Sequence, residues 1–125
     1  MKIEVSNGEL VDKVSILSIK LEKIKSAEKR ANVLKEYEYL YPIMCKIGIN
    51  ADSDEFRELR EVNLALWEIE DEIREKEAHG SYDETFIQLA RSVYFENDRR
   101  YEIKRQINRR TQSSLFEEKE YVDYK

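Results

Sequence analysis

Residues 6–24 read SNGELVDKVSILSIKLEKI, and this segment carries the pattern on which the rest of the chain is built. Its apolar residues recur every three or four positions, at Leu10, Val14, Leu17, Leu21 and Ile24. This spacing places the side chains along one face of an α-helix. Ser6 and Glu9 match a capping box, in which both side chains bond backbone amides at a helix start. The segment therefore predicts a helix that begins near Gly8.

Two more isoleucines, Ile16 and Ile19, fall on a different side of this helix. A helix that is apolar on more than one side is either central in its own fold or packed against a second subunit. The first interpretation predicts a central core helix. The second predicts a homo-oligomer that forms through the first helices, and both interpretations stay open at this point.

The helical spacing resumes in the next segment of the chain. A second apolar stripe comprises Val33, Tyr37, Leu40, Met44 and Ile47. Pro42 lies within this stripe and is expected to kink the helix, because proline has no N–H to donate. Ser26 is a suitable helix cap, so residues 8–47 form either one long helix or a helical hairpin. Residues 48–53 are predicted to be a loop.

Two further helices are predicted in the second half. The third begins near Ser53, ends at His79 and Gly80, and has an apolar stripe comprising Leu59, Val62, Leu66, Ile69 and Ile73. Ser81 and Glu84 match a second capping box. The last helix is predicted over about residues 82–110, and its expected buried face comprises Phe86, Leu89, Ala90 and Val93.

The composition agrees with an all-α fold. Among 125 residues there are only 3 Gly and 1 Pro, too few for the many turns of a sheet protein. We therefore predict one domain over residues 1–125, an antiparallel bundle of three or four helices. Residues 1–5 are expected to form a short extended arm or an edge strand. Residues 111–125 are expected to be a tail that packs partly on the bundle beside that arm.

The composition and charge of the chain also disfavour several functional classes. No run of apolar residues is long enough to cross a membrane, and no signal segment is apparent, so a cytoplasmic protein is expected. Cys45 is the only cysteine and is expected to be a buried, inert thiol; His79 is the only histidine. The net charge of −5 disfavours bulk nucleic-acid binding. We expect no metal and no cofactor.

The last helix contains a break in its apolar pattern. The face that begins with Phe86 and Val93 continues with polar residues at helical spacing, at Asn97, Arg100, Lys104 and Asn108. Asn63 and Glu70 line one edge of the third helix. A short connection makes these two helices antiparallel neighbours, which predicts that Glu70 lies near Arg91 and Asn63 near Asn97. Charge agrees, because residues 54–79 carry a net charge of −6 and residues 91–110 one of +4.

This polar seam has three interpretations. It is a structural layer that fixes how the helices pair, a solvent-facing helix end, or a pocket for a small anion, because buried charges are costly unless they are paired. The candidate ligand-binding residues are Asn63, Glu70, Arg91, Asn97, Arg100 and Lys104. Arginines and tyrosines of the same helix also suggest nucleic-acid contact as a weaker alternative.

No catalytic residues are predicted. The run from Asp71 to Glu75 is similar to half of the motif of all-α, metal-dependent nucleotide pyrophosphohydrolases, but Glu96 and Asp98 have the wrong spacing for the second half. No glycine-rich phosphate loop or nucleophile motif is present. The sequence therefore favours a non-enzymatic helical interaction or scaffold module, homo-oligomeric through its first helices. The alternative is a binding protein or enzyme for a small anionic metabolite.

Three stretches, KIEVSNGELVDKVSIL, NLALWEIEDEIRE and ARSVYFENDRRYEIKRQIN, resemble a family of short bacterial and marine-environment proteins of unknown function. The resemblance covers nearly the whole chain, and the run from Val93 to Arg100 is its most distinctive part. It implies a small helical cytosolic protein. No catalytic role is carried over by it.

Overall fold

The computed structural model describes residues 1–125 and contains four α-helices and no strand. The helices are α1 (Asn7–Lys23), α2 (Ala27–Lys46), α3 (Asp54–Ala78) and α4 (Glu84–Arg110). The all-α prediction is therefore confirmed, with four helices, and the arm at residues 1–5 is not a strand. Residues 8–47 form a hairpin rather than one long helix. None of the four helices has the length and apolar character needed to span a membrane.

The helix starts follow the predicted capping chemistry in part at one helix and depart from it at another. At α1 the Ser6 hydroxyl accepts the amide of Glu9 at 3.2 Å, but the Glu9 carboxylate bonds Lys104 instead of the Ser6 amide, so only one of the two bonds of the predicted capping box forms. At α4 the cap is Asp83, whose carboxylate accepts the amide of Phe86 at 2.9 Å, so the predicted cap at Ser81 is wrong. A carboxylate directly before the first turn also complements the positive end of the helix dipole, which a serine hydroxyl does not.

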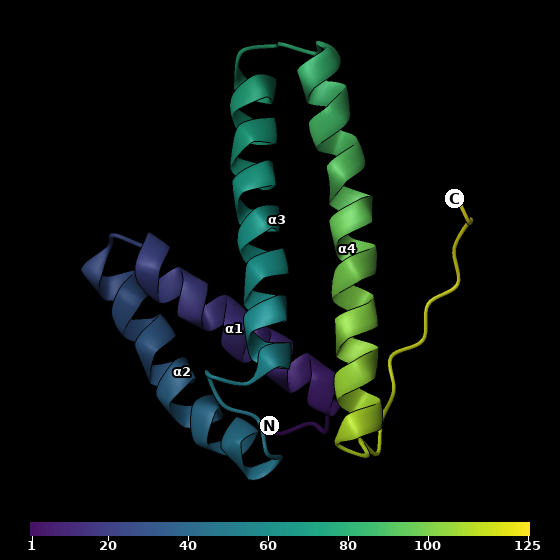
Figure 1. Cartoon of the computed structure of the whole chain (residues 1–125). Coiled ribbons are helices and arrows are strands. Elements are labelled where there is room, and N and C mark those ends of the chain that lie inside the picture. Colours follow the sequence, from purple (N-terminus) through teal and green to yellow (C-terminus); the bar gives the residue numbers. More distant parts are fainter.

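The chain folds as two hairpins of unequal length. In Figure 1 the α1/α2 hairpin lies across the base of the longer α3/α4 hairpin, which projects beyond it. α1 packs against α2, α3 and α4, and its residues Val14 and Ile19 are both fully buried although they lie on different sides. Packing within one chain therefore accounts for the apolar residues on more than one side of α1. That pattern gives no support to a second subunit.

The hydrophobic core lies at the base, where the two hairpins meet. It comprises Val11, Val14, Met44, Ile49, Phe56, Leu59, Val62, Ile103 and Ile107. No residue between 64 and 102 is fully buried, because two helices side by side shield only the strip between them. The predicted buried face of α4 is therefore wrong in its extent: Phe86 and Val93 are half-buried and Ala90 is exposed. Cys45 is exposed as well, against expectation.

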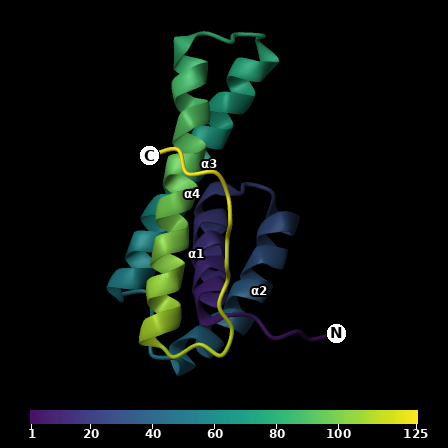
Figure 2. The same ribbon diagram turned by 90° about the vertical axis from the view of Figure 1, so that its right-hand side faces the viewer.

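The C-terminal tail, residues 111–125, turns back along α4, as Figure 2 shows. Ser114 donates a hydrogen bond to Glu4 of the N-terminal arm at 2.6 Å. Near its end, the ring of Tyr124 packs edge-on against Tyr94 and Phe95, with centroids 4.7 and 5.3 Å away. The tail therefore packs on the bundle beside the arm, as the sequence predicts.

Candidate functional site

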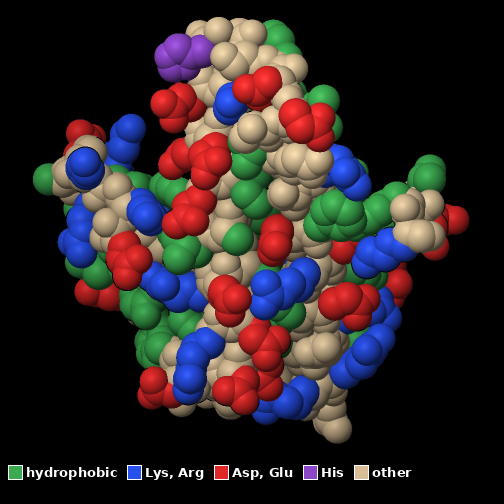
Figure 3. Space-filling view, turned by 45° about the horizontal axis from the view of Figure 1, so that its top comes forward, with side chains coloured by type: hydrophobic (Ala, Val, Ile, Leu, Met, Phe, Trp, Pro, Cys, Tyr) green, Lys and Arg blue, Asp and Glu red, His purple; other side chains and the backbone are tan.

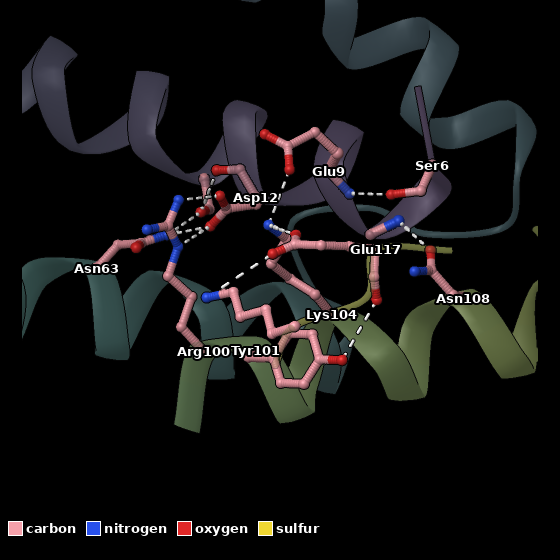
Figure 4. A network of polar contacts seen from close by, with 12 residues as sticks. Ser6, Glu9, Asp12, Asn63, Arg100, Tyr101, Lys104, Asn108 and Glu117 are labelled. Carbon is pink, nitrogen blue, oxygen red and sulfur yellow. Dashed lines mark hydrogen bonds and ion pairs between the residues drawn. The ribbon is translucent and has the colours of Figure 1, made fainter. Parts of the chain in front are cut away.

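A buried carboxylate, Asp12 of α1, joins three helices. Its side chain is 1% exposed. Arg100 of α4 donates to it through two nitrogens, Nε to Oδ1 at 3.0 Å and Nη2 to Oδ2. Asn63 of α3 donates from Nδ2 to Oδ1 of Asp12 at 2.8 Å and to Oγ of Ser15 at 2.9 Å (Figure 4). The charge of Asp12 is thus fully satisfied inside the protein, as a buried charge requires.

The pairing with Asp12 favours the charged form of Arg100. The hydrogen bond to Asp12 raises the pKa of Arg100, against the opposing effect of burial. Removing one partner of such a buried pair leaves an uncompensated charge, at a cost of about 3–5 kcal/mol. This contact therefore fixes how α4 lies against α1.

Lys104, one turn further along α4, is 6% exposed and holds two carboxylates. Its Nζ donates to Oε2 of Glu9 at 2.8 Å and to Oε2 of Glu117 at 2.7 Å. Burial alone would lower the pKa of Lys104, but these hydrogen bonds outweigh it and raise the pKa. Burial likewise opposes ionisation of Glu117, and Lys104 outweighs it, so the pKa of Glu117 is lowered. The carboxylate of Glu9 is therefore an ion-pair partner of Lys104.

The start of α1 lies directly against the backbone of α4. The amide of Gly8 donates to Oδ1 of Asn108 at 2.7 Å, and the amide of Asn7 donates to Oγ of Ser113 at 3.0 Å. A Cβ atom at position 8 would lie 2.6 Å from the carbonyl oxygen of Lys104. Only glycine permits this approach. Nδ2 of Asn108 is buried at this contact and has no hydrogen-bond partner.

A groove of about 570 Å³ adjoins Lys104, between the arm, α4 and the tail. Its polar lining includes Glu9, Asn97, Arg100, Lys104 and Glu117, and its apolar lining includes Val5, Leu115 and Phe116. The groove therefore offers cationic and amide groups beside an apolar wall. Figure 4 shows Lys104 between the carboxylates of α1 and the tail.

A second hollow of about 340 Å³ lies between α1 and α3. It is lined by Asn63, Glu70 and Arg100 together with Trp67, Asp71 and apolar residues of both helices. Arg100 borders both hollows. The ligand-binding residues predicted from the sequence are therefore divided between these two hollows, with Asn97 and Lys104 at the first and Asn63 and Glu70 at the second.

The structure brings four of the six candidate residues to the polar layer or the groove: Asn63, Asn97, Arg100 and Lys104. Glu70 and Arg91, which were predicted to lie near each other, form no ion pair with each other. Glu70 lies 3.4 Å from Arg74 of its own helix, and the guanidinium of Arg91 lies 5.9 Å from the ring centre of Phe95. Both residues are in the projecting half of the hairpin, where exposed side chains pair with neighbours one turn away.

Sequence reasoning missed the residues that complete the site, namely Asp12, Glu9 and Glu117. For Asp12 a signal was present. Gly8, Asp12, Ser15 and Ile19 follow one another at helical spacing on the second side of α1. Because Asp12 and Ser15 share this side with the apolar Ile19, the side is expected to pack against another helix. No comparable pattern marks Glu117, because the tail has no regular structure.

Most basic side chains of α4 are paired with carboxylates. Arg99 lies 3.6 Å from Glu61 of α3, as the predicted antiparallel register requires, and Arg105 lies 3.0 Å from Glu118. Figure 3 shows acidic and basic side chains intermixed on the face in view. This pairing counts against the nucleic-acid alternative, because phosphate binding depends on a surplus of unpaired positive charge.

No three His, Cys, Asp or Glu side chains are grouped so that they can hold a metal ion. Searches of curated proteins and of solved structures find no match to this chain. A family model matches residues 1–124, described as a family of unknown function, DUF6165. The match covers nearly the whole chain, including the arm, the polar layer and the tail, and the chain therefore belongs to this family of unknown function, DUF6165.

Proposed function

We propose that the protein is a binding module for a small anionic metabolite, held in the groove beside Lys104. One observation carries the proposal. A lysine that is 6% exposed borders a groove of about 570 Å³, and one of its two carboxylate partners, Glu117, belongs to the tail rather than to a helix. A purely structural lysine requires no such open groove at its charged end.

Two further groups favour an anionic ligand. Nη1 of Arg100 takes no part in the bonds to Asp12, which use Nε and Nη2. The half-buried amide of Asn97 lines the groove and takes no part in the polar layer. A guanidinium presents five N–H donors, so Arg100 retains donors for a ligand while it holds Asp12.

The lining also indicates the class of ligand. An ammonium, a guanidinium and an amide suit a carboxylate or a phosphate group. Val5, Leu115 and Phe116 beside them suit an apolar portion of the same molecule. The best match is an organic anion of metabolite size, consistent with sites that combine a few placed polar groups with apolar walls.

Thermal unfolding tests this function. The parent protein is melted with sodium acetate, citrate and phosphate, and with sodium chloride at equal ionic strength. Binding to the folded state raises the melting temperature above the chloride value. Asn97→Ala is expected to lose part of this rise, whereas Asn32→Ala, on the exposed surface of α2, keeps it. If none of the anions exceeds chloride, the proposed function is wrong.

A second candidate is self-association through the projecting half of the α3/α4 hairpin. The apolar stripe of this half includes Leu66, Ile69, Ile73, Leu89 and Val93, and none of these is fully buried. Ile87 on the outer side is 48% exposed. A second copy with its α4 against this α3 would bring Arg91, the one basic residue of this part of α4, onto the acidic side chains of α3, which favours such a pair.

Sedimentation at micromolar concentration separates this candidate from a monomer. The parent is expected to sediment as a dimer and Ile87→Glu as a monomer. Ile43→Glu, on the exposed side of α2, serves as the matched control and is expected to remain dimeric. A parent that is monomeric throughout the concentration range contradicts this candidate.

A further inference from the structure

The tail covers the groove with a carboxylate of its own. Oε2 of Glu117 lies 2.7 Å from Nζ of Lys104, at the position where an anionic ligand is expected to bind. We infer that Glu117 occupies the place of the ligand's anionic group in the free protein, so that docking of residues 117–125 and ligand binding exclude each other, while Leu115, whose carbonyl accepts a hydrogen bond from Ser113, and Phe116 remain as the groove wall. This inference rests on the proposed function and adds an internal competitor to it.

Besides Lys104, two further side chains of α4, Tyr101 and Arg105, hold the tail at this place. The backbone carbonyl of Glu117 accepts hydrogen bonds from the hydroxyl of Tyr101 at 3.3 Å and from Nη1 of Arg105 at 3.4 Å. The same Arg105 nitrogen donates to Oε1 of Glu118 at 3.0 Å. The segment thus presents two carboxylates and a carbonyl oxygen to the cationic side of α4.

Charge balance explains why an anion is needed at this place. Without the tail, the site holds three positive groups, on Arg100, Lys104 and Arg105, against two negative groups, on Glu9 and Asp12. Arg100 then keeps Asp12 and Lys104 keeps Glu9, so the unpaired positive charge is that of Arg105, and the buried Lys104 loses one of its two carboxylate acceptors. Glu117 and Glu118 of the docked tail supply both missing acceptors, and a bound anionic ligand would replace the one that Lys104 loses.

The attachment of the tail is suited to displacement. Residues 117–125 include no fully buried residue and make no backbone–backbone hydrogen bond to the helices. Their hold on α4 consists of side-chain contacts, such as the hydrogen bond from Tyr121 to Asp98 at 2.8 Å. Release of this segment therefore leaves the hydrophobic core at the base of the bundle covered.

The test compares phosphate binding by three full-length proteins in calorimetric titrations at fixed ionic strength. Glu117→Gln removes the competing charge and is expected to tighten the phosphate Kd at least about fivefold, because the apparent affinity rises with the fraction of molecules whose site is open. Glu120→Gln removes the same charge from an exposed tail residue without an ion pair, and is expected to match the parent. In the parent, saturating phosphate is expected to narrow the NMR amide signals of residues 118–125.

The outcomes separate the two proposals. If the parent binds phosphate and Glu117→Gln binds it equally or more weakly, Glu117 is not a competitor, and the inference is overturned while the proposed function stands. If the parent binds phosphate and its tail signals stay unchanged, the inference is overturned in the same way. Absence of binding in all three proteins overturns the proposed function and the inference together.

Discussion

Asp12 of α1 accepts two hydrogen bonds from Arg100 of α4, 88 residues further along the chain. Asn63 of α3 reaches the same carboxylate at 2.8 Å. Three helices that are distant in sequence are thereby joined at one buried oxygen pair. The polar layer is at once a device that fixes helix pairing and the wall of the groove that we assign to a ligand.

The first prediction concerns the cost of breaking this pair. Asp12→Ala leaves Arg100 without its partner, and is expected to lower the free energy of unfolding by about 3–5 kcal/mol. Glu36→Ala breaks the ion pair with Lys13, in which both side chains are about half-exposed, and is expected to cost about 1 kcal/mol or less. Urea unfolding followed by Trp67 fluorescence measures both. If the two variants lose the same free energy of unfolding, the buried pair stabilises the protein no more than an exposed ion pair does.

The second prediction concerns the close approach of α1 to α4. Gly8→Ala places a Cβ atom against the backbone of Lys104 and is expected to cost about 1–3 kcal/mol, since the backbone itself must shift. Gly80→Ala has open space around it, but the backbone there has φ +63°, so its cost comes from conformational strain.

Asparagine at these two glycines separates the two causes. Gly80→Asn is expected to recover much of the stability that Gly80→Ala loses, because asparagine tolerates this backbone conformation. Gly8→Asn is expected to recover none, since its Cβ meets the same carbonyl. Thermal unfolding of the four variants decides, and recovery at position 8 would contradict the account.

The third prediction is a dependence of stability on pH. The pKa of Glu117 is lowered in the folded protein from an ordinary value of 4.5. Its contribution is therefore complete above pH 4.5, and is lost as the pH falls through the lower folded pKa, because the unfolded chain binds the proton first.

The comparison of Glu117→Gln with the parent checks this sign. The parent is expected to be the more stable protein near neutral pH, and the difference in unfolding free energy is expected to shrink as the pH falls below 4.5. A difference that stays constant or grows in acid would mean that the bond between Glu117 and Lys104 does not form in solution.

The fourth prediction concerns the end of the tail. A hydrogen bond to Asp98 raises the pKa of Tyr124 to about 12, from an ordinary value of 10.0. An ultraviolet titration of the parent is therefore expected to contain a tyrosine that ionises later than the rest. Tyr124→Phe removes this late step, whereas Tyr39→Phe, at an exposed position on α2, retains it. A late step that persists in Tyr124→Phe would place the end of the tail elsewhere.

The helices were predictable because apolar spacing records which face of each helix is covered. The polar seam was predictable for the same reason, and Arg100 and Lys104 are both held in it. The spacing does not show over how much of its length each helix is covered by a third helix. α1 reaches only the base of the α3/α4 hairpin, so Arg91 lies beyond the polar layer, and Glu70 borders the hollow between α1 and α3 without bonding to the layer. Glu117 was unpredictable, because a segment without periodicity gives no indication of the side chain it will meet.

The central claim is that the polar side of α4 receives an anion, and the side-chain amide of Asn97 reports on it most directly. Isotope-labelled protein is titrated with sodium phosphate at constant ionic strength, and the NMR signals of the Asn97 and Asn32 amides are followed. The account predicts that the Asn97 signal shifts and saturates while the Asn32 signal stays in place. An Asn97 signal that does not move, or that drifts together with that of Asn32, would contradict it.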